Sequence, residues 1–143
     1  MAERVSVQLG SWDELREPAA RIRHTVFVDE QQVPAEVEID HWDPQCVHAL
    51  ARTAGGEAVG TGRLLPDGHI GRMAVLASAR GLGVGSALLI ALMSAAYRRG
   101  DREVILSAQT HAVPFYRHHG FVEEGAVYDD CNIPHIDMRR RLP

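Results

Sequence analysis

The 143-residue chain has a formal net charge of −4 at pH 7, which argues against a nucleic-acid partner because phosphate neutralisation requires a surplus of lysine and arginine. With 45% hydrophobic residues and this length, we expect one domain over residues 1–143 that buries about two thirds of its unfolded surface and needs no stabilising disulfide or metal. No apolar run reaches the roughly twenty residues of a membrane span, so we expect no membrane association.

The N-terminal half begins with the pattern of a strand followed by a helix. Residues 5–9 alternate apolar and polar side chains, as in a half-buried strand. Ser11 and Glu14 have the spacing of a capping box, which predicts a helix that runs toward Phe27. Three strands joined by short turns then predict an antiparallel meander over residues 46–53, 58–65 and 69–75.

The C-terminal half begins with a long amphipathic helix. Apolar residues keep helical spacing from Val84 to Ala95, and Gly100 stands where a helix often ends. A strand over 103–107, a short helix over 113–118 and two strands around Asn132 and Pro134 complete the chain. The order β-α-(α)-β-β-β-α-β-α-β-β predicts an α+β domain with a mixed sheet.

A glycine-dense turn joins the third meander strand to the long helix. Gly81, Gly83 and Gly85 have no Cβ atoms that would keep an anion away from the backbone. The amides after Arg80 are the unpaired N–H groups at the start of a helix, where the helix dipole favours negative charge. The turn therefore predicts a pyrophosphate site and a nucleotide-derived cofactor.

Two common phosphate-binding loops do not match this turn. A nucleoside triphosphatase loop requires Gly-Lys followed by Ser or Thr, and the chain has no lysine. A dinucleotide fingerprint would require Gly or Ala where Ser86 or Leu88 stands.

An arginine followed by glycine three and five positions later, Arg80 with Gly83 and Gly85, resembles the acyl-coenzyme A loop of the GNAT superfamily of N-acyltransferases. Residues 109–116 (QTHAVPFY) and Gly120-Phe121 are similar to the second block of that superfamily, although many members carry Asn where Gln109 stands. The N-terminal half is similar to the small bacterial ElaA-like branch at the segments 26–31, 38–40 and 48–50 and at Asp43.

The resemblance implies a GNAT acyl-CoA N-acyltransferase fold: a mixed, mostly antiparallel sheet with flanking helices and a splayed central strand pair. The strand that ends at Val75 and the strand from Glu103 would separate, and the pantetheine arm of acetyl-CoA, the cosubstrate, would enter between them. Arg80 would either reach a phosphate or brace the loop. The implied cofactor contacts are Met73, Ala74, Val75, Arg80, Gly81, Leu82, Gly83, Val84, Gly85, Ser86, Gln109 and Tyr116.

Acetyl transfer from a thioester to a primary amine requires a neutral amine, a stabilised oxyanion and a thiolate that leaves. The resemblance implies that Tyr116, whose phenol has a pKa of ~10 in model compounds, protonates the departing thiolate. The backbone N–H of Val75 is the expected oxyanion donor. No covalent intermediate is expected, because neither cysteine is clearly placed to form one.

The acceptor side offers acidic residues and two histidines. By resemblance, an acidic segment forms a lip that would attract a cationic amine, namely Asp29, Glu30, Glu36, Glu38, Asp40 and Asp43. The alternative is that these carboxylates, Glu30 excepted, face solvent or cap turns. His48 and His135 lie on predicted strands and could accept a proton through water, or could be structural. The predicted catalytic set is Tyr116, Glu30 and His135.

Neither a metal site nor cysteine chemistry is indicated. The eight histidines show no metal-ligand spacing, and Cys46 and Cys131 are predicted to be reduced. The start of the chain lacks a signal peptide, so we expect a cytoplasmic protein. Family resemblance suggests a homodimer through the C-terminal strands. Two other readings stay open: a non-catalytic acyl-CoA-binding regulatory module, and a dinucleotide-dependent enzyme that binds NAD.

Overall fold

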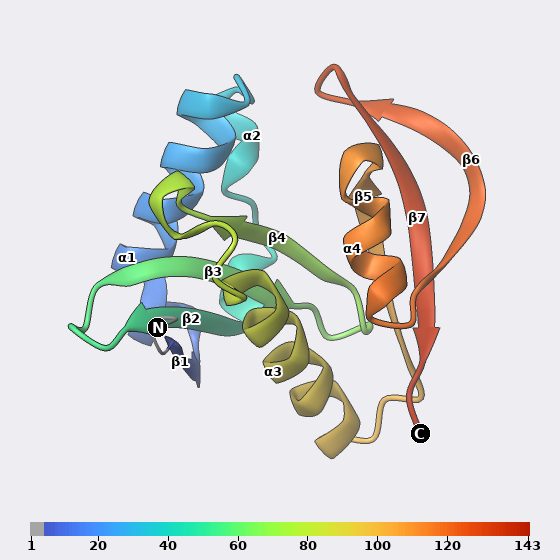
Figure 1. Cartoon of the computed structure of the whole chain (residues 1–143), viewed down its shortest axis with the longest axis horizontal. Coiled ribbons are helices and arrows are strands. Elements are labelled where there is room, and N and C mark those ends of the chain that lie inside the picture. The colour runs from blue at the N-terminus through green and yellow to red at the C-terminus, as the bar shows by residue number, and fades with distance from the viewer. Residues whose placement is uncertain (1–4) are drawn as a thin grey trace.

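The computed structural model describes residues 5–143, which form two antiparallel sheets with flanking helices (Figure 1). The first four residues, on which the prediction of a cytoplasmic protein partly depends, lie outside the described residues. The first sheet has the order β1-β2-β3-β4, with β1 (Val5–Gly10), β2 (Val47–Thr53), β3 (Ala58–Leu64) and β4 (Ile70–Val75). The second has the order β5-β7-β6, with β5 (Glu103–Gln109), β6 (Val122–Asp130) and β7 (Ile133–Arg141). A parallel bridge between His69 and Ile105 joins them, so the combined sheet is mixed, as predicted.

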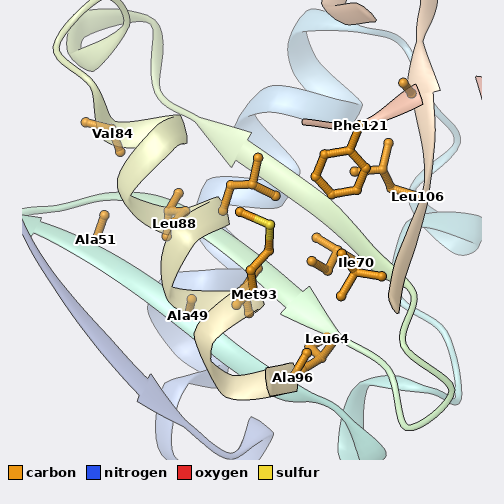
Figure 2. Close-up of a cluster of buried hydrophobic side chains, with 14 of the residues drawn as sticks. Ala49, Ala51, Leu64, Ile70, Val84, Leu88, Met93, Ala96, Leu106 and Phe121 are labelled. Atoms are coloured by element: carbon orange, nitrogen blue, oxygen red, sulfur yellow. The ribbon is translucent and has the colours of Figure 1, made fainter. Parts of the chain in front are cut away.

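Helices α1 (Trp12–Arg23) and α3 (Val84–Arg98) cover opposite faces of the first sheet. On β2, Leu50 packs in a cluster with residues of α1, whereas its neighbours Ala49 and Ala51 pack beneath α3 (Figure 2). Helix α4 (Val113–His118) lies against β5 and β6. The short helical segments are α2 (Ala35–Glu38), η2 (Asp43–Gln45), η3 (Ala77–Ala79) and η4 (Thr110–Ala112). None of the helices within residues 5–143 has the length and apolarity to cross a bilayer.

The first helix begins as predicted but ends differently. The capping box is confirmed, because the Ser11 N–H donates to Glu14 Oε1 at 2.9 Å and the Glu14 N–H donates to Ser11 Oγ at 3.3 Å. Helix α1 ends at Arg23, and a seven-residue π-helix, η1 (His24–Glu30), continues the chain past Phe27. The wider i→i+5 winding of a π-helix is often found at functional sites.

Helix α3 approaches the sheet closely because β3 carries glycines beneath it. A Cβ atom at Gly60 would lie 2.8 Å from Val84 Cγ1, and one at Gly62 would lie 2.9 Å from Leu92 Cδ1. This close packing brings the N-terminus of α3 beside the end of β4 (Figure 1).

Strand β4 is irregular at its centre. Its register against β3 shifts between Thr61 and Arg63, and Arg72 has a left-handed φ of 48°. After this bulge the Leu76 N–H donates to the Val59 carbonyl on β3. Because successive residues of a strand alternate, Met73 and Val75 present their backbone groups to the opposite edge, toward β5.

Candidate active site

A cavity of about 910 Å³ lies between β4 and β5. Its other walls come from η1, α4 and the turn between β6 and β7. This volume is in the range of pockets that hold small molecules and cofactors. The predicted site residues that line it are Glu30, Met73, Ala74, Val75, Arg80, Gln109, Tyr116 and His135. The segment 81–86 is not in the lining, and it follows Arg80 directly at the start of α3.

The glycine turn has an exposed helix N-terminus. Gly81 and Gly83 have left-handed φ angles of 80° and 79°, and Gly83 is the residue before the first turn of α3. Within the described part of the chain, the backbone N–H groups of residues 81–86 donate to no carbonyl or side chain. These free donors at the positive end of a 15-residue helix suit an anionic group.

Arg80 fastens the end of β4 to the π-helix. Its Nε donates to the Val75 carbonyl at 3.0 Å, and its Nη2 donates to the two Glu30 carboxylate oxygens at 3.0 and 2.8 Å. Of the two roles considered for Arg80, this arrangement is the bracing one. Beyond the turn, Ser86 Oγ lies 2.9 Å from His119 Nε2.

Tyr116 lies on α4 with its ring in contact with two other aromatic rings. The ring centroids of Phe115 and Phe121 lie 5.1 and 5.9 Å away, both nearly edge-on. Burial raises the pKa of Tyr116 to about 12. Among the described residues its hydroxyl has no hydrogen-bond partner. The site therefore holds a protonated phenol whose hydroxyl is available to a ligand in the cavity.

The side-chain amide of Gln109 is hydrogen-bonded to side chains that the sequence analysis did not identify as its partners. Its Nε2 donates to Gln31 Oε1 at 2.9 Å, and Gln31 Nε2 donates back to Gln109 Oε1 at 3.3 Å. His111 Nε2 lies 2.9 Å from the same Gln109 oxygen. This amide pair ties β5 to the end of η1, across the cavity from β4.

His135 lies on β7 with one ring nitrogen committed. Its Nδ1 donates to the Ile133 carbonyl at 2.7 Å, so in the neutral ring Nε2 is the unprotonated nitrogen. The ring stacks on Tyr128 with centroids 6.1 Å apart. Nε2 makes no hydrogen bond to a described residue, so its lone pair is free to accept one.

Of the two roles considered for His48, the structure shows the structural one. His48 is 1% exposed, packs on the Trp12 ring at 4.8 Å and lies outside the cavity lining. Its Nε2 is 2.9 Å from the Asp43 backbone carbonyl, and burial lowers its pKa. It is a satisfied structural residue.

Three members of the acidic segment, Glu38, Asp40 and Asp43, are paired with arginines and are not available to a cationic amine. Arg23 donates to both Asp43 oxygens, at 2.7 and 3.1 Å, and forms an ion pair with Glu38. Arg63 donates to both Asp40 oxygens, at 2.7 and 2.8 Å, and to Asp43 at 2.9 Å. These hydrogen bonds hold the pKa of Asp40 at about 2. The three carboxylates are thus neutralised internally, and Glu30 is paired with Arg80.

Arg72 is a site residue that sequence reasoning missed. From the β4 bulge its Nε donates to the Glu38 carbonyl at 3.0 Å, and its Nη2 lies 3.3 Å from Asp40 Oδ2. Arg72 therefore attaches the segment around α2 to strand β4. This part of the cavity lining, formed by Val37, Glu38 and Arg72, is called the cavity mouth. No sequence signal predicts it, because a left-handed arginine within a strand contradicts local propensity.

Both cysteines are free. Burial raises the pKa of Cys46 to about 11, so it is not a reactive thiolate at neutral pH. Cys131 is exposed in the β6–β7 turn and lines the cavity. Residues 5–143 contain no group of three or more His, Cys, Asp or Glu side chains arranged to hold a metal ion.

Comparisons with known proteins identify the family of the chain. Residues 16–142 match the acetyltransferase (GNAT) domain family. The chain is 41% identical to YjcF of Bacillus subtilis (strain 168), named as an uncharacterised N-acetyltransferase, over 132 residues that cover 90% of this chain and 94% of that protein. Two crystal structures each cover 96% of this chain and 99% of their own: an acyl-CoA N-acyltransferase from Pseudomonas aeruginosa, at TM-score 0.84 and 33% identity, and Escherichia coli ElaA, at 0.83 and 31%. The chain belongs to the GNAT acetyltransferase family and is an acyl-CoA-dependent N-acyltransferase.

Proposed function

We propose that the protein transfers an acetyl group from acetyl-CoA to a primary amine, on a small molecule or a protein, by direct attack in a ternary complex. The observation that carries this proposal is the unpartnered Tyr116 hydroxyl in a cavity bounded by the free edge of β4. That edge and the free amides of residues 81–86 offer donors for one extended, anionic cosubstrate.

In this proposal the pyrophosphate binds the amides of residues 82–86. The pantetheine amides pair with the backbone of Met73 and Val75, as if the cofactor were an added strand. The Val75 N–H then lies beside the thioester carbonyl and stabilises the oxyanion. Arg80 supports this geometry, because it holds the Val75 carbonyl and thereby the end of β4.

The chemistry follows from the same groups. The amine nitrogen attacks the thioester carbon, a C–N bond forms, and the carbonyl electrons move to the oxygen. A base removes the proton from nitrogen. When the oxyanion collapses, the C–S bond breaks and Tyr116 donates its proton to the leaving sulfur.

The base is proposed to be His135, with Glu30 as the other candidate. Arg80 occupies the Glu30 carboxylate, whereas His135 Nε2 has no partner among the described residues. We expect His135→Gln to lower kcat about 10²-fold, the usual contribution of a general base, and Glu30→Gln to lower it far less. Steady-state rates of thiol release with a saturating amine make the comparison. A larger loss in Glu30→Gln would assign the base to Glu30.

Calorimetric titration with acetyl-CoA, with NAD as the parallel control, tests the cosubstrate. A panel of primary amines, followed by release of the coenzyme A thiol, then tests the transfer. Micromolar binding of acetyl-CoA alone is the expected result. A folded sample that binds no acetyl-CoA contradicts the proposal, and binding without turnover across the panel would favour the regulatory module.

A homodimer through the C-terminal strands is part of the proposal. Strand β6 is at the edge of its sheet, and Val122 and Val127 on it are 69% and 59% exposed. Edge strands with exposed apolar side chains readily pair with another chain. Sedimentation velocity is expected to give the mass of a dimer, and replacement of Val127 by lysine should shift it to that of a monomer.

A further inference from the structure

A chain of three hydrogen-bonded side chains lies on the second sheet beside the cavity and has no part in the chemistry above. Ser107 lines the cavity, and its hydroxyl is hydrogen-bonded to the Tyr128 hydroxyl. The Tyr128 hydroxyl in turn donates to Asp137 Oδ1 at 2.7 Å. The three residues come from three different strands: β5, β6 and β7.

The sheet register places these side chains on one face. Ser107 is paired with Asp137, and Gln109 and Tyr128 are each paired with His135, so the four positions 107, 109, 135 and 137 share the face turned away from the core. On the other face Leu106, Ala108 and Met138 are buried. The hydroxyl chain and His135 therefore belong to a single wall.

The direction of each hydrogen bond in the chain follows from the number of protons. Tyr128 has one hydroxyl proton, which it donates to Asp137. The bond between Ser107 and Tyr128 must therefore use the proton of Ser107, which leaves only lone pairs on Ser107 Oγ for the cavity. His135 likewise has its proton on Nδ1 and a lone pair on Nε2. Toward the cavity, Ser107 Oγ and His135 Nε2 can therefore only accept hydrogen bonds.

We propose that this wall binds the N–H groups of the acceptor amine, with Ser107 and His135 as the contacts and Tyr128 and Asp137 as positioning residues. The inference rests on the proposed acetyl transfer to an amine and gives the acceptor side of the site a fixed hydrogen-bond polarity. It replaces the acidic segment, in which Glu38, Asp40 and Asp43 are neutralised internally, as the feature that selects an amine.

The test removes the acceptor-only carboxylate that sets this polarity and keeps the shape of the wall. In Asp137→Asn, the carboxamide N–H can donate to Tyr128, Tyr128 can then donate to Ser107, and the Ser107 proton would face the cavity. The matched control is Asp130→Asn, because Asp130 also lines the cavity but does not bond to Tyr128. Both variants lose one negative charge.

The probe is n-butylamine, titrated into protein saturated with coenzyme A while NMR follows the imidazole resonance of His135. We expect Asp137→Asn to weaken n-butylamine binding at least about tenfold, because the hydrogen bonds lost involve a charged donor. Tyr128→Phe should weaken it less, and Asp130→Asn should remain close to the wild type. The dissociation constant of coenzyme A should be the same in all four proteins.

An equal loss in Asp137→Asn and Asp130→Asn would reduce the effect to net charge and overturn the inference. An unchanged affinity in Asp137→Asn, or no response of His135 to n-butylamine in the wild type, would overturn it as well. Failure of the wild type to bind acetyl-CoA would instead contradict the proposed function, so the two failures are distinguishable. Thermal denaturation of each variant shows that the wall has been altered in a folded protein.

Discussion

Replacement of Tyr116 by phenylalanine is expected to lower kcat about 10²-fold and to leave the dissociation constant of acetyl-CoA nearly unchanged. The substitution removes one oxygen and keeps the ring between Phe115 and Phe121, so packing is preserved. The lost group is the proposed donor to the leaving thiolate. Stopped-flow measurement of thiol release, under conditions in which chemistry limits the rate, separates this effect from product release.

The matched control is Tyr97→Phe, which removes the same hydroxyl from an exposed position on α3. It should behave as the wild type does. Because burial raises the pKa of Tyr116 to about 12, the phenol remains a donor throughout the neutral and mildly alkaline range. A decline in rate at mildly alkaline pH would therefore have to come from another group. An unchanged kcat in Tyr116→Phe would remove Tyr116 from the mechanism.

The starts of α1 and α3 could be predicted from the sequence because their signals are local. Ser11 and Glu14 set the start of α1 within one turn, and the glycine turn sets the start of α3 through the backbone conformations at Gly81 and Gly83. Both features depend on residues a few positions apart. Helix and strand periods then account for the order of the other elements.

The partners of the acidic segment and of Gln109 could not be predicted, because these contacts join distant parts of the chain. The partners of Asp43 are Arg23 and Arg63, each twenty residues away in sequence, and Gln109 bonds to Gln31 seventy-eight positions away. The six carboxylates in residues 29–43 predict a negatively charged surface, because the sequence does not show that Arg23 and Arg63 pair with some of them. The π-helix escaped prediction for a different reason, since its apolar pattern through Phe27 resembles that of an α-helix.

Replacement of a buried carboxylate, Asp43, is expected to have a large effect on the free energy of unfolding. Asp43 is fully buried and accepts hydrogen bonds from Arg23 and Arg63, which hold its pKa below the usual value although burial alone would raise it. We expect Asp43→Asn to lower the free energy of unfolding by about 3–5 kcal/mol, because removal of one partner leaves buried guanidinium charges uncompensated. Urea denaturation at neutral pH measures the loss.

Asp29→Asn is the matched control from the same acidic segment, because Asp29 is largely exposed and should change stability by less than about 0.5 kcal/mol. A loss as large in Asp29→Asn would mean that total negative charge, and not the buried network, stabilises this region.

The same network predicts how stability depends on pH. The pKa of Asp40 is about 2 in the folded protein against an ordinary value of 3.8, so the folded state binds this proton less readily than the unfolded state. The contribution of Asp40 to stability is therefore complete above about pH 4 and is lost as the pH falls toward 2. Asp43→Asn should flatten this dependence, since it removes a second carboxylate with a lowered pKa.

Arg72 joins Asp40 and the Glu38 carbonyl to the β4 bulge. Acid should therefore release the cavity mouth before the remainder of the fold, and hydrogen exchange of the amides around α2 at pH 3 measures this. Simultaneous loss of protection at α2 and α3 would show that the mouth and the core unfold as one unit.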